Sequence, residues 1–138
     1  YYSIDEKGKE HIIQFAPEGW FISDRLSNWH QNKDDFFIEA LEPTTALLLT
    51  GDALTALAKR NHDFLELNYQ LLNNHVRQLQ KRINQLLSYT AEARYLDFIQ
   101  DYPDIMSRVP QIMVASYLGI TPESLSRVRK ELAEKNKN

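Results

Sequence analysis

The feature that most constrains this fold is a seam of apolar residues spaced alternately four and three positions apart. The seam consists of Leu65, Tyr69, Leu72, Val76, Leu79, Ile83 and Leu86. No Gly or Pro interrupts residues 52–101, so a single helix from about residue 63 to residue 89 can carry the whole seam. Leu at the d positions and mostly β-branched residues at the a positions favour a parallel two-stranded coiled coil. We therefore interpret the seam as a dimer interface. The alternative is an amphipathic helix that packs this stripe onto its own domain.

The first fifty residues have the character of β structure. Apolar runs at 1–4 and 10–15 flank a turn-like cluster that contains Gly8. A second turn follows at 17–19, and the later apolar runs lie at 20–22, 36–38 and 46–49. Because the chain opens within the first run, we expect further residues before Tyr1.

Helical patterns replace the β pattern from Asp52, which is the expected cap of a short helix over 53–60. Beyond the long helix we expect helices at 91–101, which Pro103 ends, at 104–108, at 111–118 and from Pro122 to about 133, with Thr121 as the cap of the last one. The sequence thus predicts an α+β chain with a partial β-roll effector domain (1–51), a dimerisation segment (52–90) and a DNA-binding domain (91–138).

The last two predicted helices have the pattern of a helix-turn-helix. Gly119 lies at the turn, where positive φ is needed, and Ala115 is small where the second helix must cross closely. The residues expected to face inward are Val114, Ala115, Leu118, Ile120, Leu125 and Val128. The alternative is a helical hairpin with an ordinary charged face.

Side chains on and near the outer face of the final helix suit contacts with DNA. The candidates there are Thr121, Glu123, Ser124, Ser126, Arg127, Arg129 and Lys130, and Gln111 at the start of the preceding helix is a further one. In the major groove, Arg matches the acceptors of guanine and Glu matches the donor of cytosine, while Ser, Lys and a helix N-terminus suit phosphates. Residues 105–138 hold six basic and three acidic residues, whereas residues 1–61 hold six and ten. This asymmetry indicates that the tail meets an anion.

Two stretches, "EGWFISD" and "RVPQIMVASYLGITPESLSRVRKEL", and the order of the predicted elements resemble the cyclic AMP receptor/fumarate–nitrate regulator superfamily of bacterial transcription factors. The likeness covers essentially the whole chain. It implies a cyclic-nucleotide-binding-like jelly roll, a long parallel dimerisation helix and a helix-turn-helix of the winged-helix type, whose wing is either absent or cut off from this sequence. It also implies a cytoplasmic homodimer that binds double-stranded DNA and contacts RNA polymerase.

The family's E-x-x-S-R pattern, which reads a TGA-containing half-site, is matched here by Glu123, Ser126 and Arg127. The resemblance implies that Arg127 takes a guanine, Glu123 an amino group of cytosine or adenine, and Ser126 a thymine or a phosphate. Pro122 stands where the cyclic AMP branch carries an Arg, which places the readout nearer the fumarate–nitrate branch.

The same comparison argues against the family's known cofactors. Asp34 and Asp35 fall where cyclic-nucleotide members carry Arg-Ser, and a carboxylate there repels the cyclic phosphate, so we expect no cyclic AMP binding. The chain has no cysteine for an iron–sulfur cluster, and its four scattered histidines do not suggest haem or a metal site. The weak candidates for the pocket of an unknown small effector are Trp20, Phe21, Ser23, Asp24, Asp34 and Asp35. For the aromatic residues, core packing is the alternative.

Other classes of protein fit the sequence less well. The chain has no Gly-rich phosphate loop and no recognisable nucleophile–base pairing, so we expect no enzyme. No apolar run reaches the length of a membrane span. A small-molecule sensing module without regulated DNA binding and a pure coiled-coil adaptor remain as alternatives to a DNA-binding regulator.

Overall fold

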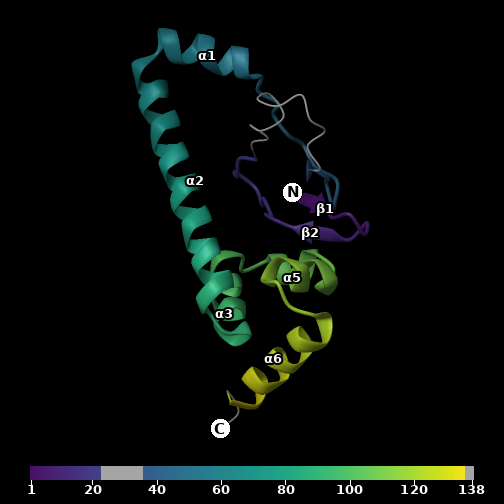
Figure 1. Ribbon diagram of the computed structural model, residues 1–138. Helices are drawn as coiled ribbons and strands as arrows, with labels where there is room; N and C mark the ends of the chain where they lie inside the picture. The colour runs from purple at the N-terminus through teal and green to yellow at the C-terminus, as the bar shows by residue number, and fades with distance from the viewer. Residues whose placement is uncertain (23–35, 136–138) are drawn as a thin grey trace. The chain divides into compact units, whose positions relative to one another are not determined.

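The computed structural model describes residues 1–22 and 36–135 (Figure 1). Within these residues the chain forms three short strands and then six helices, β1–β3 and α1–α6. This mixture of helices and antiparallel sheet agrees with the α+β prediction. The chain divides into two compact units, one made of Tyr1–Leu41 and Tyr89–Asn138 and the other of Glu42–Ser88.

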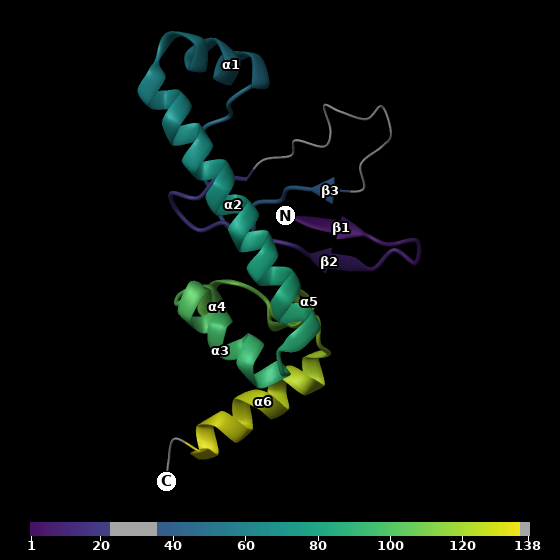
Figure 2. The ribbon, with the colours of Figure 1, turned by 60° about the vertical axis from the view of Figure 1, so that its left-hand side comes forward.

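The first unit contains a small antiparallel sheet in which the first strand is central. β1 (Tyr2–Ile4) pairs with β2 (Glu10–Ile12) on one side and with β3 (Phe36–Phe37) on the other, as Figure 2 shows. The ring of Tyr2 stacks on that of Phe37, with centroids 5.3 Å apart. Cross-strand aromatic pairs of this kind stabilise a sheet this small.

The turn between β1 and β2 is closed by a carboxylate. Asp5 accepts hydrogen bonds from the backbone N–H groups of Lys7 and Lys9, each at 2.9 Å, and Gly8 supplies the positive φ of 77° that the turn needs. His11 lies 2.9 Å from the same carboxylate. The hydrogen bond with His11 and the backbone bond from Lys9 lower the pKa of Asp5 to about 2.

Two of the apolar runs in the segment expected to have β structure do not form strands. Residues 20–22 and 46–49 are irregular, and in the second run Leu47 and Leu48 are 84% and 90% exposed. A strand needs a neighbour that satisfies its backbone groups, and these runs pair with no other segment of residues 1–22 and 36–135. The sheet of the described residues is small and open, so the β-roll stays a prediction.

The helices of the first unit follow the predicted segments closely. Thr90 caps the first of them, since its hydroxyl accepts a hydrogen bond from the backbone N–H of Ala93 at 3.2 Å. Pro103 follows its end, as predicted. The bounds are α3 Ala91–Asp101, α4 Ile105–Arg108, α5 Gln111–Leu118 and α6 Pro122–Lys135.

One apolar core joins the sheet to these helices. Its buried members are Ile12, Phe15, Phe98, Tyr102, Ile105, Val114, Ala115, Leu118 and Leu125. The sequence prediction divides residues 1–51 and 91–138 into separate domains, because their local patterns differ. The structure differs from this division, since residues from both segments bury their side chains against one another.

Five aromatic residues pack against one another in this core and at its margin. The ring centroid of Phe15 lies 6.1 Å from those of Phe98 and Tyr102 and 5.5 Å from that of Tyr117. Trp20 packs on Tyr102 at 5.3 Å. We call these five residues the aromatic cluster. Edge-on and tilted pairs add about 0.5–1.5 kcal/mol each beyond the burial of their area.

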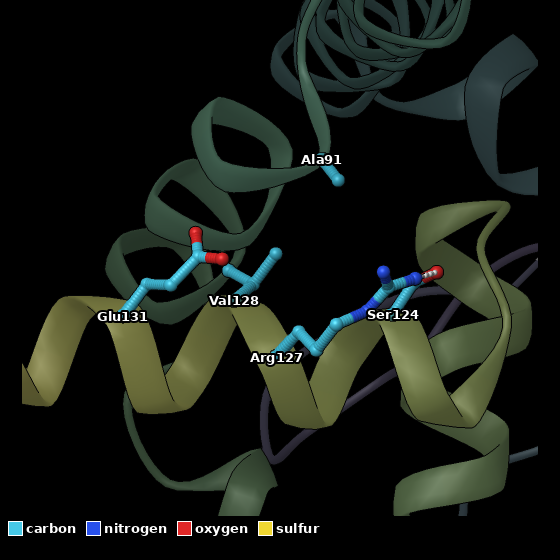
Figure 3. Close-up of a pocket in the computed structure, with 5 residues that line it drawn as sticks. All are labelled: Ala91, Ser124, Arg127, Val128 and Glu131. Carbon is cyan, nitrogen blue, oxygen red and sulfur yellow. Dashed lines mark hydrogen bonds between the residues drawn. The ribbon is translucent and has the colours of Figure 1, made fainter.

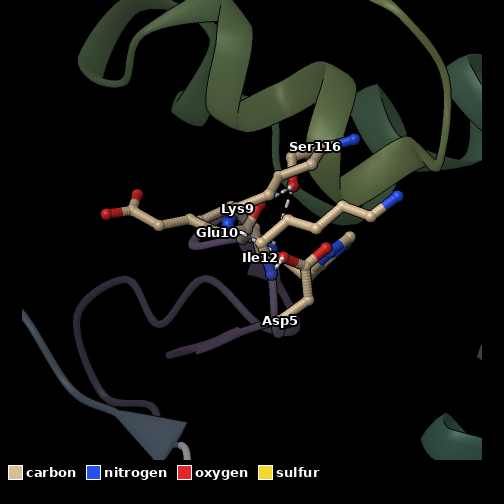
Figure 4. A network of polar contacts seen from close by, with 7 residues as sticks. Asp5, Lys9, Glu10, Ile12 and Ser116 are labelled. Atoms are coloured by element: carbon tan, nitrogen blue, oxygen red, sulfur yellow. Dashed lines mark hydrogen bonds and ion pairs between the residues drawn. The ribbon is translucent and has the colours of Figure 1, made fainter.

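The edge of the sheet is closed by one hydroxyl from a helix (Figure 4). Ser116 of α5 accepts a hydrogen bond from the backbone N–H of Ile12 at 3.0 Å and donates one to the carbonyl of Glu10 at 3.2 Å. Both groups lie on the side of β2 that does not face β1. A single serine therefore takes the place of the next strand and blunts an edge that would otherwise expose unpaired backbone.

An ion pair adds a second link between the N-terminal segment and the helices. Arg108, at the end of α4, donates to both carboxylate oxygens of Glu18, at 2.8 and 3.0 Å. Glu18 lies in the predicted turn, where the N–H of Trp20 bonds to the carbonyl of Pro17 at 3.2 Å. The bidentate geometry with Arg108 holds the pKa of Glu18 at about 2.

The second unit consists of two helices in sequence, α1 (Gly51–Arg60) and α2 (His62–Ser88). α1 begins earlier than predicted, because its cap is Thr50 rather than Asp52. The hydroxyl of Thr50 accepts a hydrogen bond from the backbone N–H of Ala53 at 3.3 Å. Asn61 separates the helices and accepts a hydrogen bond from the first turn of α2 at 3.1 Å. α2 is continuous over the predicted seam.

Substitution of Ser116 by Ala should destabilise the protein by about 1–3 kcal/mol, because it leaves the half-buried N–H of Ile12 and the carbonyl of Glu10 without their partner. The measurement is urea unfolding. Ser107→Ala is the matched control, since within the described residues that exposed hydroxyl bonds to the carbonyl of Asp104, the residue before α4, and its loss should stay within about 0.5 kcal/mol. Equal losses for the two variants would contradict the role of Ser116.

The carboxyl group of Glu18 should titrate at about pH 2 in a carbon-13 NMR titration. Because its folded pKa lies below the ordinary value of 4.5, its contribution to stability is present above pH 4.5 and is lost as the pH falls through about 2. In the Arg108→Gln variant, the pKa should return toward 4.5. An unchanged pKa in that variant would show that Arg108 is not the cause.

Candidate nucleic-acid interface

The connection between α5 and α6 is a tight turn built on one glycine. Gly119 adopts φ 66° and ψ 36°, the left-handed conformation that L residues with a Cβ adopt only under strain. The N–H of Gly119 bonds to the carbonyl of Ser116, and the N–H of Ile120 bonds back to that of Ala115, each at 3.0 Å. These bonds end α5 sharply and set the direction in which α6 leaves.

The inward faces of α5 and α6 are the predicted ones. Val114, Ala115 and Leu118 on α5 are at most 1% exposed, and Leu125 on α6 is fully buried. Val128 lies one turn further along α6 and is 9% exposed. Burial of these residues turns the opposite face of α6 toward solvent.

The start of α6 contains a chain of side-chain hydrogen bonds. The hydroxyl of Thr121 caps the helix by accepting from the backbone N–H of Ser124 at 3.2 Å, as predicted for this residue. The same hydroxyl lies 3.2 Å from that of Ser124. The guanidinium of Arg127 in turn donates to the hydroxyl of Ser124 at 3.3 Å. Three of the predicted DNA-contacting residues are therefore linked before any DNA is present.

The carboxylate of Glu123 belongs to the same turn. A hydrogen bond from its own backbone N–H, and then one from the hydroxyl of Thr121, lower the pKa of Glu123, and the charge of Arg127 acts in the same direction. Glu123 is exposed and ionised at neutral pH, so it presents acceptor oxygens to any donor that approaches this end of α6.

An open pocket of about 190 Å³ lies beside this turn (Figure 3). Arg127, Val128, Ser124 and Glu131 line it from α6, and Ala91, the first residue of α3, lines it from the other side. A guanidinium and the start of a helix both favour an anion such as a phosphate, whereas the carboxylate of Glu131 opposes one. The pocket therefore contains groups that attract an anion and one carboxylate that repels it.

The structure places most of the predicted DNA-contacting residues on one exposed surface. Arg129 is half-buried at the edge of the inward face, and Ser124 is partly covered by its neighbours. Gln111 is the exposed first residue of α5, which has no side-chain cap. The exposed residues of the predicted set on α6 and its cap are Thr121, Glu123, Ser126, Arg127 and Lys130.

Part of the positive charge of the C-terminal region is already engaged. Arg108 pairs with Glu18, and Lys135 at the end of α6 contacts Glu92 of α3 at 2.8 and 3.0 Å, which raises the pKa of Lys135. The excess of basic residues in 105–138 therefore overstates the charge offered to an anion. What remains on α6 is concentrated at residues 127–130.

Sequence reasoning missed Glu131 and Ala91. A carboxylate four residues after Arg127 on one helix could have been found by its spacing, because such residues are neighbours on a helix surface. Ala91 carries no chemical signal in the sequence. Its place beside Arg127 arises only from the packing of α3 on α6.

The remaining predicted site residues lie elsewhere. All seven residues of the seam on α2 are exposed in the single chain, from 37% at Leu72 to 67% at Tyr69. Of the candidate effector residues, Trp20 belongs to the aromatic cluster and Phe21 is 65% exposed. Trp20 is itself 38% exposed, so it lies at the margin of the core. Ser23, Asp24, Asp34 and Asp35 lie outside the described residues.

Comparisons with models of known protein families, with characterised proteins and with solved structures found no match. In residues 1–22 and 36–135 no three His, Cys, Asp or Glu side chains are grouped so that they could hold a metal ion. No helix of the described part of the chain has both the length and the apolar character needed to cross a membrane.

Proposed function

We propose that this chain is a homodimeric, sequence-specific DNA-binding regulator of transcription, in which α5 and α6 act as a helix-turn-helix. The observation that carries the proposal is the asymmetry of α6. Leu125 and Val128 are buried against the core, and the opposite face presents Glu123, Ser126 and Arg127 to solvent. A helix with this exposed chemistry fits the major groove.

The roles proposed for these residues follow from the groups on each base. Arg127 donates two hydrogen bonds to O6 and N7 of guanine, and the carboxylate of Glu123 accepts from an amino group of cytosine or adenine. Ser126 contacts a thymine or a phosphate. Lys130 and the exposed start of α5 at Gln111 contact phosphates, which orient the protein without reading sequence. A TGA-type half-site follows from this set.

The seam on α2 supports the dimer. Seven large apolar side chains spaced four and three apart remain exposed on a 27-residue helix, and a single soluble chain rarely leaves so long a stripe uncovered. A parallel pair of these helices covers the stripe and gives the protein two-fold symmetry. The operator is then an inverted repeat, with half-sites about 34 Å apart.

Control by an unknown small effector is part of the same proposal. The sheet shares its core with α5, so a ligand that alters the sheet acts on residues packed against the DNA-binding helices. Cyclic AMP is not the proposed ligand. The proposed setting is the cytoplasm, with RNA polymerase as a further partner.

The experiment that tests the proposed function is selection of binding sites from random duplex DNA at a stated salt concentration. Enrichment of an inverted repeat with TGA-type half-sites is the expected result. If no sequence is enriched, either alone or with metabolite extract present, the proposal is wrong and α5 and α6 serve only for packing.

Two substitutions on α6 should have different effects on the selected site. Arg127→Ala should weaken binding by about 1–3 kcal/mol and relax the preference at one base pair per half-site. Lys130→Ala should weaken binding to all sequences alike. It should also lower the slope of log affinity against log salt concentration by about one, because one phosphate contact is lost. Titrations on the selected duplex and on a duplex altered at the guanine distinguish the two patterns. The same pattern for both variants would contradict the assigned roles.

A charge placed in the seam should dissociate the dimer. Leu72→Asp puts a carboxylate at a central d position, where pairing would bury it, so sedimentation equilibrium should show a monomer. Asn74→Asp, on the outward side of the same helix, is the matched control and should leave the dimer intact. A dimer that survives Leu72→Asp would place the interface elsewhere.

A further inference from the structure

The side chain of Arg127 is held by a neighbour on its own helix before DNA binds. Its guanidinium donates to the hydroxyl of Ser124 at 3.3 Å, and that hydroxyl lies 3.2 Å from the hydroxyl of Thr121. The backbone N–H of Ser124 is bonded to Thr121 as well. The hydroxyl and the backbone N–H of Ser124 are therefore both bonded to Thr121, the cap of α6.

The side chain of Arg127 points toward the N-terminal end of α6. In Figure 3 it extends toward Ser124, and Glu131 lies on the opposite side of the pocket. Glu131 is four residues further along α6 and carries a negative charge, with which a guanidinium at this spacing could pair. The bond to Ser124 keeps the guanidinium at the end of the helix that enters a groove.

We propose that Ser124 is a positioning residue, whose hydroxyl holds the guanidinium of Arg127 in the orientation from which it reads a base pair. This inference rests on the proposed function and assigns to Ser124 a role other than direct contact with DNA. A guanidinium has five N–H donors, and the bond to Ser124 uses one of them. Enough remain for the bidentate contact with guanine.

The physical benefit is preorganisation. A free arginine side chain has many rotamers, and the entropy lost when it docks on a base lowers the affinity. Ser124 restricts these rotamers in the unbound protein. The gain is realised only on a site that offers the guanine, so it appears as specificity rather than as general affinity for DNA.

The test uses the full chain and two duplexes, the selected inverted repeat and the same repeat altered at the guanine assigned to Arg127. Ser124→Ala removes the hydroxyl but keeps the backbone N–H that bonds to Thr121, and alanine suits a helix. Ser124→Thr restores a hydroxyl. Ser107→Ala on α4 is the control for loss of an exposed serine hydroxyl. Thermal unfolding of each variant establishes that α6 is intact.

Ser124→Ala should lower the affinity ratio between the two duplexes by about two- to tenfold, the range expected for one hydrogen bond, and Ser124→Thr should recover most of it. Its effect should disappear when Arg127 is already replaced by Ala, because the two residues act through one contact. The slope of affinity against salt should not change.

Two results would overturn the role of Ser124 alone. If Ser124→Ala weakens binding to both duplexes equally and lowers the salt slope by about one contact, Ser124 binds a phosphate. If Arg127→Ala relaxes the preference but Ser124→Ala leaves it unchanged, Ser124 has no part in the readout. If Arg127→Ala itself has no effect on preference or affinity, the proposed function is wrong and the role of Ser124 falls with it.

Discussion

The contact on which the first unit most depends is the insertion of Phe15 among aromatic rings from the far end of the chain. Its ring meets Phe98, Tyr102 and Tyr117, and Phe15 is only 6% exposed. A sheet of three strands with two or three residues each would not be stable alone. The helices supply the apolar surface that the sheet lacks, and the sheet in turn covers one side of α5.

This dependence determines how α6 is presented. α5 is buried on one side by the sheet and on another by α6, so its position leaves little freedom to the turn at Gly119. Leu125 is then fully buried, and the charged face of α6 is exposed as a consequence. The hydrogen bonds from Thr121 through Ser124 to Arg127 depend only on the first two turns of α6. Packing against the core therefore sets the direction of α6, and the local hydrogen bonds set the orientation of the Arg127 side chain.

The predictions that succeeded concern features encoded within a few residues. The apolar periods placed α3 and α5 within the correct bounds, Thr121 was recognised as a cap, and Gly119 was recognised at the turn. One prediction failed because the segment needed a partner, and another failed because two nearby residues suit the same position. Residues 46–49 have an apolar run typical of a buried strand, yet a strand forms only beside another strand, and Thr50 replaced Asp52 as a cap because both residues suit that position.

What the sequence by itself determined is the succession of helices, the inward and outward faces of α5 and α6, and the heptad seam of α2, because spacing along the chain sets which side chains share a face. Only the tertiary structure decided that the sheet and the C-terminal helices share a core, that Ser116 closes the edge of β2, and that Ala91 lies beside Arg127. The bond from Ile12 to Ser116 joins residues 104 positions apart. No local pattern encodes such a contact, because it exists only when two distant surfaces are complementary in shape and in hydrogen bonding.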